Sequence, residues 1–312
     1  MQTFSDRLAD AIRAKGSPVV VGLDPRVQQL PPGIISDDKR DDPHACADAF
    51  GRFCGDVIDA VAPFVPAVKP QCAFFEQLGP PGMTALRDVV RHAAAAGLLV
   101  ILDGKRNDIG STAEAYAEGF LGPGESSAWG GDALTVSPYL GDDSLAPFVA
   151  AAERRGAGIF VLVKTSNPGG GQFQDLLCDG RPLHEHVAAH VERLAAAGPG
   201  ESGYGAVGAV VGATYPEQLA RLRSLMPHAW ILVPGYGSQG GTARDVAAAF
   251  DERGLGAVVN NSRGIIFAHA RQEYARFGPA RWQAAVEAAT RDMNEALRAD
   301  TSAGQLPAPQ TN

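Results

Sequence analysis

Residues 98–108 read LLVILDGKRND, five apolar residues followed by the pattern Asp-x-Lys-x-x-Asp of Asp103, Lys105 and Asp108. The apolar run predicts a β-strand that is buried on both faces. Since residues two apart in a strand share a face, Asp103 and Lys105 should point the same way, with Asp108 just beyond the strand end. This arrangement would hold an ammonium between two carboxylates. Such a fixed cation can stabilise or protonate a carbanion without a cofactor.

Charges at a strand end also have an ordinary explanation, because an Asp–Lys pair at a surface contributes only about 0–1 kcal/mol. The distribution of lysine favours a functional role. The lysines of the chain are Lys15, Lys39, Lys69, Lys105 and Lys164. The last three end or follow apolar β-like runs, and an ammonium is not interchangeable with the guanidinium that fills most basic positions here. We expect Lys164 to be structural.

Strand-like and helix-like segments alternate along the whole chain. The eight expected strands are Val19–Asp24, Val65–Lys69, Leu98–Lys105, Ala133–Val136, Ile159–Lys164, Ala206–Gly212, Trp230–Pro234 and Ala257–Asn260. Strict alternation implies a parallel sheet with right-handed crossovers. Eight units predict an α/β protein with a single closed (β/α)8 TIM barrel. A doubly wound open sheet ranks second, because Asp24-Pro25-Arg26 follows the first strand instead of a Gly-rich turn.

Helices are expected at Ala45–Val61, Met83–Ala96, Leu145–Arg155, Leu183–Ala197, Pro216–Leu225 and Ala243–Arg253. Ser5 is the expected N-cap of an opening helix that ends near Lys15, with Gly16 as its stop, and that covers the bottom of the barrel. The barrel domain should span residues 1–298. Residues 299–312 form a polar, Pro-containing tail that we expect to be disordered. Loop-like insertions lie at Leu30–Pro43, Gly122–Gly131 and Asn167–Pro182.

Composition narrows the classes of partner. The net charge of −8 argues against nucleic-acid or acidic-membrane partners. The four cysteines form no C-x-x-C pair and no His cluster accompanies them, so no metal or disulfide framework is expected. The first residues carry no apolar signal core, and no apolar run reaches the ~18 residues of a membrane span. We therefore expect a cytoplasmic protein.

Two loops after the last strands suit a phosphate group. Pro234–Gly241 is a Gly-rich turn that enters a helix, where backbone N–H groups favour an anion. Arg263, just after the eighth strand, adds a guanidinium that can bind phosphate bidentately. TIM barrels place phosphates at these two loops. At the mouth of the same barrel, Asp24 can accept a hydroxyl proton, and Thr165-Ser166-Asn167 can offer polar groups to a heterocycle.

The chain resembles the orotidine 5′-phosphate decarboxylase family over nearly the whole barrel. The blocks that carry the resemblance are Val21–Arg26, Val68–Glu76, Leu102–Thr112, Lys164–Pro168, Val211–Thr214 with Pro216-Glu217, Pro234–Gly241 and Asn261–Ile265. The block Lys69-Pro70-Gln71-Cys72-Ala73-Phe74-Phe75-Glu76 and the long insertions look like the longer bacterial branch. The resemblance implies cofactor-free decarboxylation of orotidine 5′-phosphate to uridine 5′-phosphate in pyrimidine biosynthesis.

The resemblance also implies roles for individual residues. Lys105 would donate a proton to C6 of the pyrimidine, and Asp103 would face the departing carboxylate. Lys69 and Asp24 would bind ribose hydroxyls. Ser166 and Gln239 would contact the base and the phosphate side. Arg263 and the amides of Gly240 and Gly241 would hold the phosphate. Asp108 and Thr112 would reach into the partner's site in a homodimer.

Three alternatives stay open at this point. The Asp-x-Lys-x-x-Asp motif is shared with sugar-phosphate barrels such as 3-keto-L-gulonate 6-phosphate decarboxylase and hexulose-6-phosphate synthase, which use magnesium held by acidic strand ends. Here the second strand ends in Lys69, which would repel a metal. A Schiff-base aldolase is disfavoured because flanking carboxylates raise a lysine pKa, whereas attack needs the free amine. A non-catalytic phosphoribosyl-binding barrel is the third.

Overall fold

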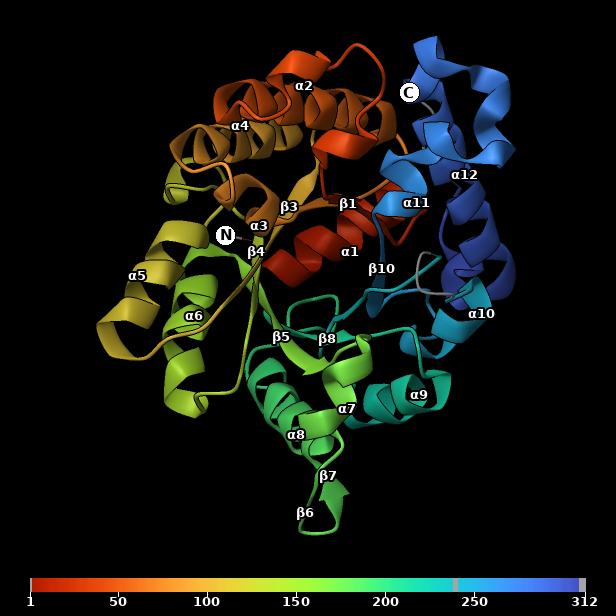
Figure 1. The fold of residues 1–312 in the computed structure, drawn as a ribbon. Helices are drawn as coiled ribbons and strands as arrows, with labels where there is room; N and C mark the ends of the chain where they lie inside the picture. Colours follow the sequence, from red (N-terminus) through yellow and green to blue (C-terminus); the bar gives the residue numbers. More distant parts are fainter. Residues whose placement is uncertain (1, 238–240, 309–312) are drawn as a thin grey trace.

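The computed structural model describes residues 2–237 and 241–308. Eight parallel strands close into a barrel with the order β1-β10-β9-β8-β5-β4-β3-β2 (Figure 1). The strands are β1 (Val19–Leu23), β2 (Ala67–Pro70), β3 (Leu99–Arg106), β4 (Ala133–Val136), β5 (Gly158–Lys164), β8 (Val207–Val211), β9 (Ile231–Val233) and β10 (Ala257–Asn261). This confirms the predicted TIM barrel, and each strand boundary lies within two residues of the expected one.

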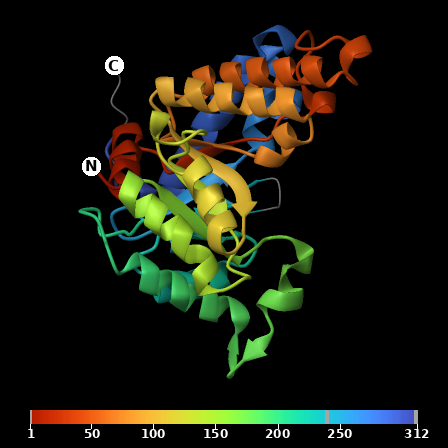
Figure 2. The same cartoon turned by 90° about the vertical axis from the view of Figure 1, so that its left-hand side faces the viewer.

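Helices surround the barrel and connect consecutive strands (Figures 1 and 2). They are α1 (Phe4–Lys15), α2 (Pro43–Val61), α3 (Cys72–Glu76), α4 (Pro80–Ala95), α5 (Gly110–Phe120), α6 (Asp142–Arg155), α7 (Gly171–Gln174), α8 (Leu183–Ala195), α9 (Pro216–Leu225), α10 (Ala243–Val246), α11 (Arg263–Ile266) and α12 (Trp282–Asp300). Within the described ranges, no helix is both long and apolar enough to cross a bilayer.

The expected helix Ala243–Arg253 is shorter than predicted. It ends at Val246, a single 3-10 turn follows at Ala247–Ala249, and Phe250 is extended. The reason lies in Asp251, whose Oδ1 accepts hydrogen bonds from the backbone N–H groups of Arg253 and Leu255. Such local side-chain bonds favour a turn over a continued helix.

The opening helix α1 has a different cap from the one predicted. Thr3, not Ser5, is the N-cap, and its hydroxyl accepts a hydrogen bond from the Asp6 backbone at 3.1 Å. Ser5 is buried inside the first turn and donates to the Gly205 carbonyl instead. The predicted stop is confirmed, since Gly16 adopts the left-handed conformation with φ of +59°.

Helix α1 closes the bottom of the barrel, as expected. In Figure 1 it crosses the centre of the ring of strands. Its apolar face, which includes Phe4 and Leu8, packs in one buried cluster with residues that point inward from the strands. Phe4 meets Phe160 of β5 edge to face, with ring centroids 5.9 Å apart. A second, larger cluster fills the layer between the sheet and the outer helices.

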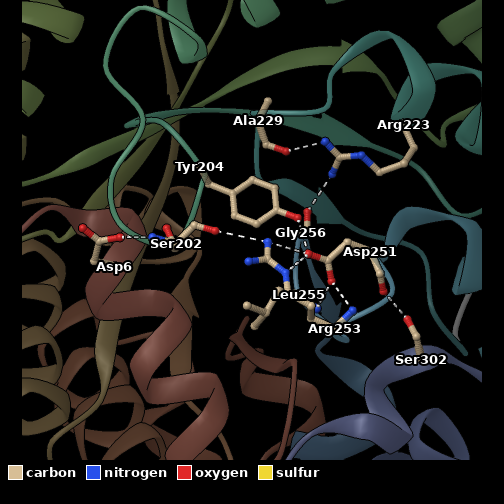
Figure 3. A network of polar contacts seen from close by, with 10 residues as sticks. All are labelled: Asp6, Ser202, Tyr204, Arg223, Ala229, Asp251, Arg253, Leu255, Gly256 and Ser302. Atoms are coloured by element: carbon tan, nitrogen blue, oxygen red, sulfur yellow. Dashed lines mark hydrogen bonds and ion pairs between the residues drawn. The ribbon is translucent and has the colours of Figure 1, made fainter.

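A polar network ties together the loops at this closed end (Figure 3). The Tyr204 hydroxyl donates to Asp251 at 2.9 Å, and the guanidinium groups of Arg223 and Arg253 lie over the Tyr204 ring. Burial and the nearby Asp251 charge raise the pKa of Tyr204 to about 12. Burial opposes ionisation of Asp251, but hydrogen bonds from Leu255, Arg253 and Tyr204 outweigh it and lower its pKa. This network is structural, because it lies at the opposite end from the strand termini that form TIM-barrel sites.

The segment expected to be disordered is ordered as far as it is described. Helix α12 runs to Asp300, and a 3-10 turn follows at Ser302–Gln305. Ala303 and Leu306 are buried in the same cluster as α1. These two apolar residues pack into the core and order the segment, although most of its residues are polar. Residues 309–312 lie outside the described residues.

The three predicted insertions contain short elements of their own. The first holds a 3-10 turn at Asp37–Lys39, and the second holds one at Gly124–Ser126. The third contains α7 and an antiparallel hairpin of β6 (Leu177–Cys178) and β7 (Arg181–Pro182). This hairpin projects from the body of the barrel beside α8 (Figures 1 and 2).

Candidate active site

A cavity of about 530 Å³ opens at the carboxyl ends of the barrel strands, where TIM barrels carry their sites. Its wall is formed by residues within or just after each of the eight barrel strands. The residues predicted from the sequence that line it are Asp24, Lys69, Asp103, Lys105, Ser166 and Arg263. The barrel therefore brings six predicted site residues, separated by up to 239 positions along the chain (263 − 24 = 239), into one cavity.

The Asp103 carboxylate lies at the centre of this site and accepts four hydrogen bonds. Its Oδ1 accepts from Lys105 Nζ at 2.6 Å and from Thr135 Oγ1 at 2.9 Å. Its Oδ2 accepts from Lys69 Nζ at 2.5 Å and from Gln71 Nε2 at 3.2 Å. Both oxygens are thus fully engaged, which fixes the orientation of the carboxylate and of both ammonium groups.

Electrostatics keep the buried members of this cluster charged. Burial opposes ionisation of Asp103, but the charges and hydrogen bonds of Lys69 and Lys105 outweigh it and hold the Asp103 pKa well below its usual range. Burial likewise opposes the charge on Lys69, yet the charges of Asp103 and Asp24 outweigh it and raise the Lys69 pKa. At neutral pH the floor of the cavity therefore holds a carboxylate between two lysine side chains.

Lys105 differs from its expected setting in two ways. Its backbone has φ of +45°, a left-handed conformation that is uncommon for a residue with a side chain. The register between β3 and β4 shifts between Leu102 and Arg106, so the chain is irregular at this position. The Lys105 side chain is 47% exposed and lies at the cavity mouth, whereas the Asp103 side chain is 8% exposed. An irregular strand end of this kind re-aims a side chain toward a site.

The predicted placement of Lys105 between two carboxylates is wrong within one chain. Lys105 pairs with Asp103, but Asp108 accepts a hydrogen bond from its neighbour Ile109 and is not a wall residue of the cavity. The chain continues past the strand end toward α5 and does not turn back over Lys105. Thr112 lies in the first turn of α5, is exposed, and is also outside the cavity wall.

The two loops that the sequence indicated for a phosphate both border the cavity, through Gly235 and Arg263. Gly235 and Gly237 have φ of +97° and +69°, which a turn of this shape requires of glycine. The Gly237 N–H donates to the carbonyl of Gly241 at 2.8 Å and closes the loop on itself. Arg263 lies across the cavity at the start of α11. The predicted contacts Gln239 and Gly240 lie outside the described residues.

The segment after β5 forms another wall. Thr165, Ser166 and Asn167 all line the cavity. Gly212, at the end of β8, permits this arrangement, because a Cβ there would lie 2.8 Å from the Ser166 Cβ. These three residues therefore border the space that a ligand would occupy.

Three residues that line the cavity, Gln71, Thr135 and Asn260, were not predicted, although the sequence pattern could have indicated each of them. Gln71 follows Lys69 by two positions, the spacing of one strand face. Thr135 and Asn260 are polar residues inside apolar strands of a buried parallel sheet. Asp24 and Asn260 each have a buried Oδ1 atom without a hydrogen-bond partner in the described chain, and both line the cavity. Buried acceptors of this kind are suited to a ligand.

Comparison with known proteins decides between the possible families of barrel. A family model described as orotidine 5′-phosphate decarboxylase / HUMPS family matches residues 10–277. The chain belongs to this family. It is 58% identical to the orotidine 5′-phosphate decarboxylase of Rhodopirellula baltica, with 96% of this chain and all of that protein covered. Identity to the enzyme of the same name from Deinococcus radiodurans is 45%, covering 85% of this chain and 90% of that one.

Solved structures give the same result. The crystal structure titled as a putative orotidine 5′-phosphate decarboxylase from Streptomyces avermitilis is 36% identical and superposes with a TM-score of 0.79, covering 97% of both chains. The OMP decarboxylase of Leishmania donovani is 34% identical with a TM-score of 0.73, covering 96% of this chain and 98% of that one. The family resemblance, the barrel and the carboxy-lyase class are therefore confirmed.

The charges of the site differ from those of the magnesium-dependent sugar-phosphate barrels, which hold the metal on acidic strand ends. Among residues 2–237 and 241–308, no three His, Cys, Asp or Glu side chains gather in a way that could hold a metal ion. The Asp103 carboxylate, which could otherwise ligate a cation, is occupied by Lys69 and Lys105. The residues present therefore fit a reaction in which the ammonium groups supply the positive charge.

Proposed function

We propose that this chain converts orotidine 5′-phosphate to uridine 5′-phosphate, a step of pyrimidine biosynthesis, without a cofactor. The observation that carries the proposal is the Asp103 carboxylate with Lys69 and Lys105 on its two oxygens, at the floor of a cavity that Arg263 also lines. This cluster offers a fixed cation beside a fixed anion. Such an arrangement can stabilise the carbanion that decarboxylation leaves when no electron sink is present.

The proposed reaction breaks the bond between C6 and the carboxyl carbon. Carbon dioxide leaves, the electron pair stays on C6, and the Lys105 ammonium transfers a proton to C6. The carbanion has no electron sink, so the barrier reduction must be about 20 kcal/mol, near the upper part of the enzymatic range. Lys105 supplies preorganised positive charge where negative charge develops. Asp103 faces the departing carboxylate and keeps Lys105 oriented.

The remaining residues hold the substrate. Asp24 and Lys69 bind ribose hydroxyls, and the orphaned Asp24 Oδ1 supports this role because it needs a donor. Ser166 contacts the base, and Gln239 reaches the base and phosphate. Arg263, with the backbone of Gly240 and Gly241, binds the phosphate. Binding energy from the phosphate then serves to place the substrate carboxylate beside Asp103.

We further propose a homodimer with shared active sites. Asp108 and Thr112 lie outside the wall of their own cavity, on the rim formed by the end of β3 and the start of α5. Ile109 between them is 56% exposed, and Tyr139 on the adjacent rim is 83% exposed. Apolar side chains on this rim suit a contact with a second copy. A two-fold contact would carry Asp108 to the partner's Lys105.

A turnover experiment tests the activity. Incubation with orotidine 5′-phosphate should lower the ultraviolet absorbance of the substrate and release one carbon dioxide for each uridine 5′-phosphate formed. Borohydride added during turnover should trap no covalent adduct, because the proposed lysine acts as an acid. Trapping of a substrate adduct on Lys69 or Lys105 would instead indicate Schiff-base chemistry.

A further inference from the structure

Lys164 is a buried lysine next to the active site that the proposed mechanism does not use. It ends β5, its side chain is 3% exposed, and it is not a wall residue of the cavity. Phe160 lies in the inner cluster and Leu162 lines the cavity, so strand alternation alone would point Lys164 inward. A register shift between β5 and β8, at Leu162 and Lys164, breaks this alternation. The irregularity turns the ammonium away from the substrate space.

The ammonium is turned toward the third insertion. Lys164 Nζ lies 2.6 Å from Oδ1 of Asp175, the C-cap of α7, and 5.8 Å from the centre of the Tyr215 ring. His184, at the start of α8, adds its Nδ1, which lies 3.2 Å from Asp175 Oδ1 and 2.9 Å from the Gln174 carbonyl. A carbonyl only accepts hydrogen bonds, so Nδ1 carries the proton. Lys164 and His184 thus hold Gln174, the last residue of α7, and Asp175, which follows it.

The end of α7 in turn holds the active-site wall. The Gln174 Oε1 accepts from the Thr165 backbone N–H at 3.0 Å, and the Gln174 Nε2 donates to Thr165 Oγ1 at 2.8 Å. The Thr165 hydroxyl then donates to Asn167 Oδ1 at 2.7 Å. A short chain of contacts therefore runs from the buried ammonium through Asp175 and Gln174 to the segment Thr165–Asn167. Within this series of contacts, only the segment Thr165–Asn167 meets the substrate in the proposed reaction, through Ser166.

We propose that Lys164, Asp175 and Gln174 are positioning residues, which fix the Thr165–Asn167 wall in the place where it recognises the pyrimidine ring. The inference deepens the proposed function and rests on it. The Lys164 side chain is 3% exposed and that of Asp175 is 43% exposed, so the ammonium is the buried member of the pair. A buried ammonium without a partner is costly, so Lys164 favours the arrangement in which Asp175 lies against it. Fixing the wall in advance removes the cost of ordering it when the ligand binds. The phosphate and ribose contacts come from other strands and are independent of this anchor.

The test uses two variants that act at different points of the chain of contacts. Lys164→Met together with Asp175→Asn removes both charges at once, so no unpaired charge is left at the buried position 164. Gln174→Ala leaves the ion pair intact and removes only the two bonds to Thr165. The matched control is Glu185→Gln, which weakens the ion pair between Glu185 of α8 and Arg221 of α9 and affects no residue in contact with the wall. Circular dichroism establishes that each variant is folded.

The readout is the affinity of two ligands, uridine 5′-phosphate and ribose 5-phosphate, measured by calorimetry. Both carry the phosphoribosyl group, and only the first carries the base. Loss of the two Gln174 bonds should weaken uridine 5′-phosphate binding about tenfold, in line with the free energy of one or two net hydrogen bonds. The affinity for ribose 5-phosphate should stay within about twofold, and the Glu185→Gln protein should match the wild type for both ligands.

The outcomes separate the inference from the proposed function. If Gln174→Ala or the folded double variant weakens both ligands equally, or neither, the positioning role is wrong even though the activity stands. If the double variant does not fold, Gln174→Ala alone decides. If the wild-type protein binds uridine 5′-phosphate no more tightly than ribose 5-phosphate, the proposed pyrimidine site itself is wrong, and the positioning role is wrong with it.

Discussion

Lys69 and Lys105 bind different oxygens of one carboxylate, with their Nζ atoms 2.5 Å from Asp103 Oδ2 and 2.6 Å from Asp103 Oδ1. Two ammonium groups on one carboxylate give the cluster of Lys69, Asp103 and Lys105 a net positive charge, beside which the Asp24 carboxylate also lies. The two lysines are not equivalent, because the Lys69 side chain is buried and that of Lys105 is half exposed at the cavity mouth. Lys69 can therefore hold Asp103 in place while Lys105 meets the substrate.

This arrangement predicts that activity is independent of divalent metals. The positive charges of Lys69 and Lys105 repel a cation, and they occupy the oxygens that would ligate it. Turnover of orotidine 5′-phosphate should be unchanged after exhaustive dialysis against a chelator and after addition of magnesium. Loss of turnover on chelation, with recovery on adding magnesium, would instead place the chain with the metal-dependent sugar-phosphate barrels.

The 5′-phosphate should contribute to catalysis as well as to binding. Orotidine, which lacks the phosphate, should be a far poorer substrate than orotidine 5′-phosphate, with the loss in kcat as well as in KM. Arg263→Ala should lower kcat/KM for the nucleotide by about 100-fold or more, the effect of a lost charge-assisted phosphate contact. It should change kcat/KM for orotidine by no more than about threefold, since no phosphate is present to be bound.

Arg87→Ala is the control for this substitution. Arg87 pairs with Asp88 on the exposed face of α4 and should affect neither substrate. Equal losses for nucleotide and nucleoside in the Arg263 variant, or equal kcat/KM of the two substrates with the wild type, would exclude the phosphate role of Arg263.

Complementation between variants tests the shared site. Lys69→Ala damages the active site of the subunit that carries the substitution. Asp108→Ala damages the active site of its partner, because Asp108 is proposed to reach across the interface. Each variant alone should be nearly inactive. In a mixed dimer both lesions fall in one site and leave the other intact, so random exchange should restore about 25% of wild-type activity.

Subunit exchange has to be demonstrated separately, for instance with two differently tagged variants recovered together. Mixing Lys69→Ala with a second variant of the same half, Lys105→Ala, is the control and should restore nothing. If exchange is complete and the Lys69 and Asp108 variants still fail to complement, Asp108 acts within its own subunit.

The network at the closed end of the barrel should affect stability without affecting catalysis. Asp251→Asn weakens the acceptor for Tyr204, Arg253 and Leu255, and should lower the free energy of unfolding by about 2 kcal/mol while kcat/KM stays at the wild-type value. The Asp251 pKa is lowered in the folded protein, so its contribution is present above the unfolded pKa and is lost as pH falls through the folded value.

The pH dependence of the Asp251 effect provides an internal check. The difference in unfolding free energy between the wild type and Asp251→Asn should be constant from about pH 5 to 8 and should shrink below about pH 4, near the unfolded pKa of an aspartate. Denaturant unfolding at several pH values measures it. A difference that grows as pH falls has the wrong sign for a stabilising carboxylate.

The barrel and most of its site could be predicted because they depend on strand periodicity. Buried parallel strands read as apolar runs, and the polar residues that follow them meet at one end of the barrel, as Asp24, Lys69 and Asp103 do. The features of the site that were not predicted depend on local irregularities of the backbone. Nothing in the spacing of Asp103, Lys105 and Asp108 shows the left-handed Lys105 backbone or the register shift beside it. That geometry separates Asp108 from Lys105 within the chain.

Lys164 illustrates the same limit. The sequence indicates a lysine at a strand end, and a structural role was the expected one, but its partner Asp175 lies in an insertion that reads as a loop. The contact exists because a strand irregularity reorients Lys164 and because Asp175 is the C-cap of the short helix α7. Neither the register shift nor so short a helix produces a hydrophobic periodicity that could be recognised in the sequence.

The most direct measurement for the whole account is kcat/KM for orotidine 5′-phosphate in the wild type, in Lys105→Ala and in the surface control Lys39→Ala. The wild type and Lys39→Ala should decarboxylate the substrate equally, whereas Lys105→Ala should fold normally but have no measurable activity. If Lys105→Ala keeps more than about a tenth of the wild-type activity, a loss of only ~1.4 kcal/mol, then Lys105 is not the proton donor.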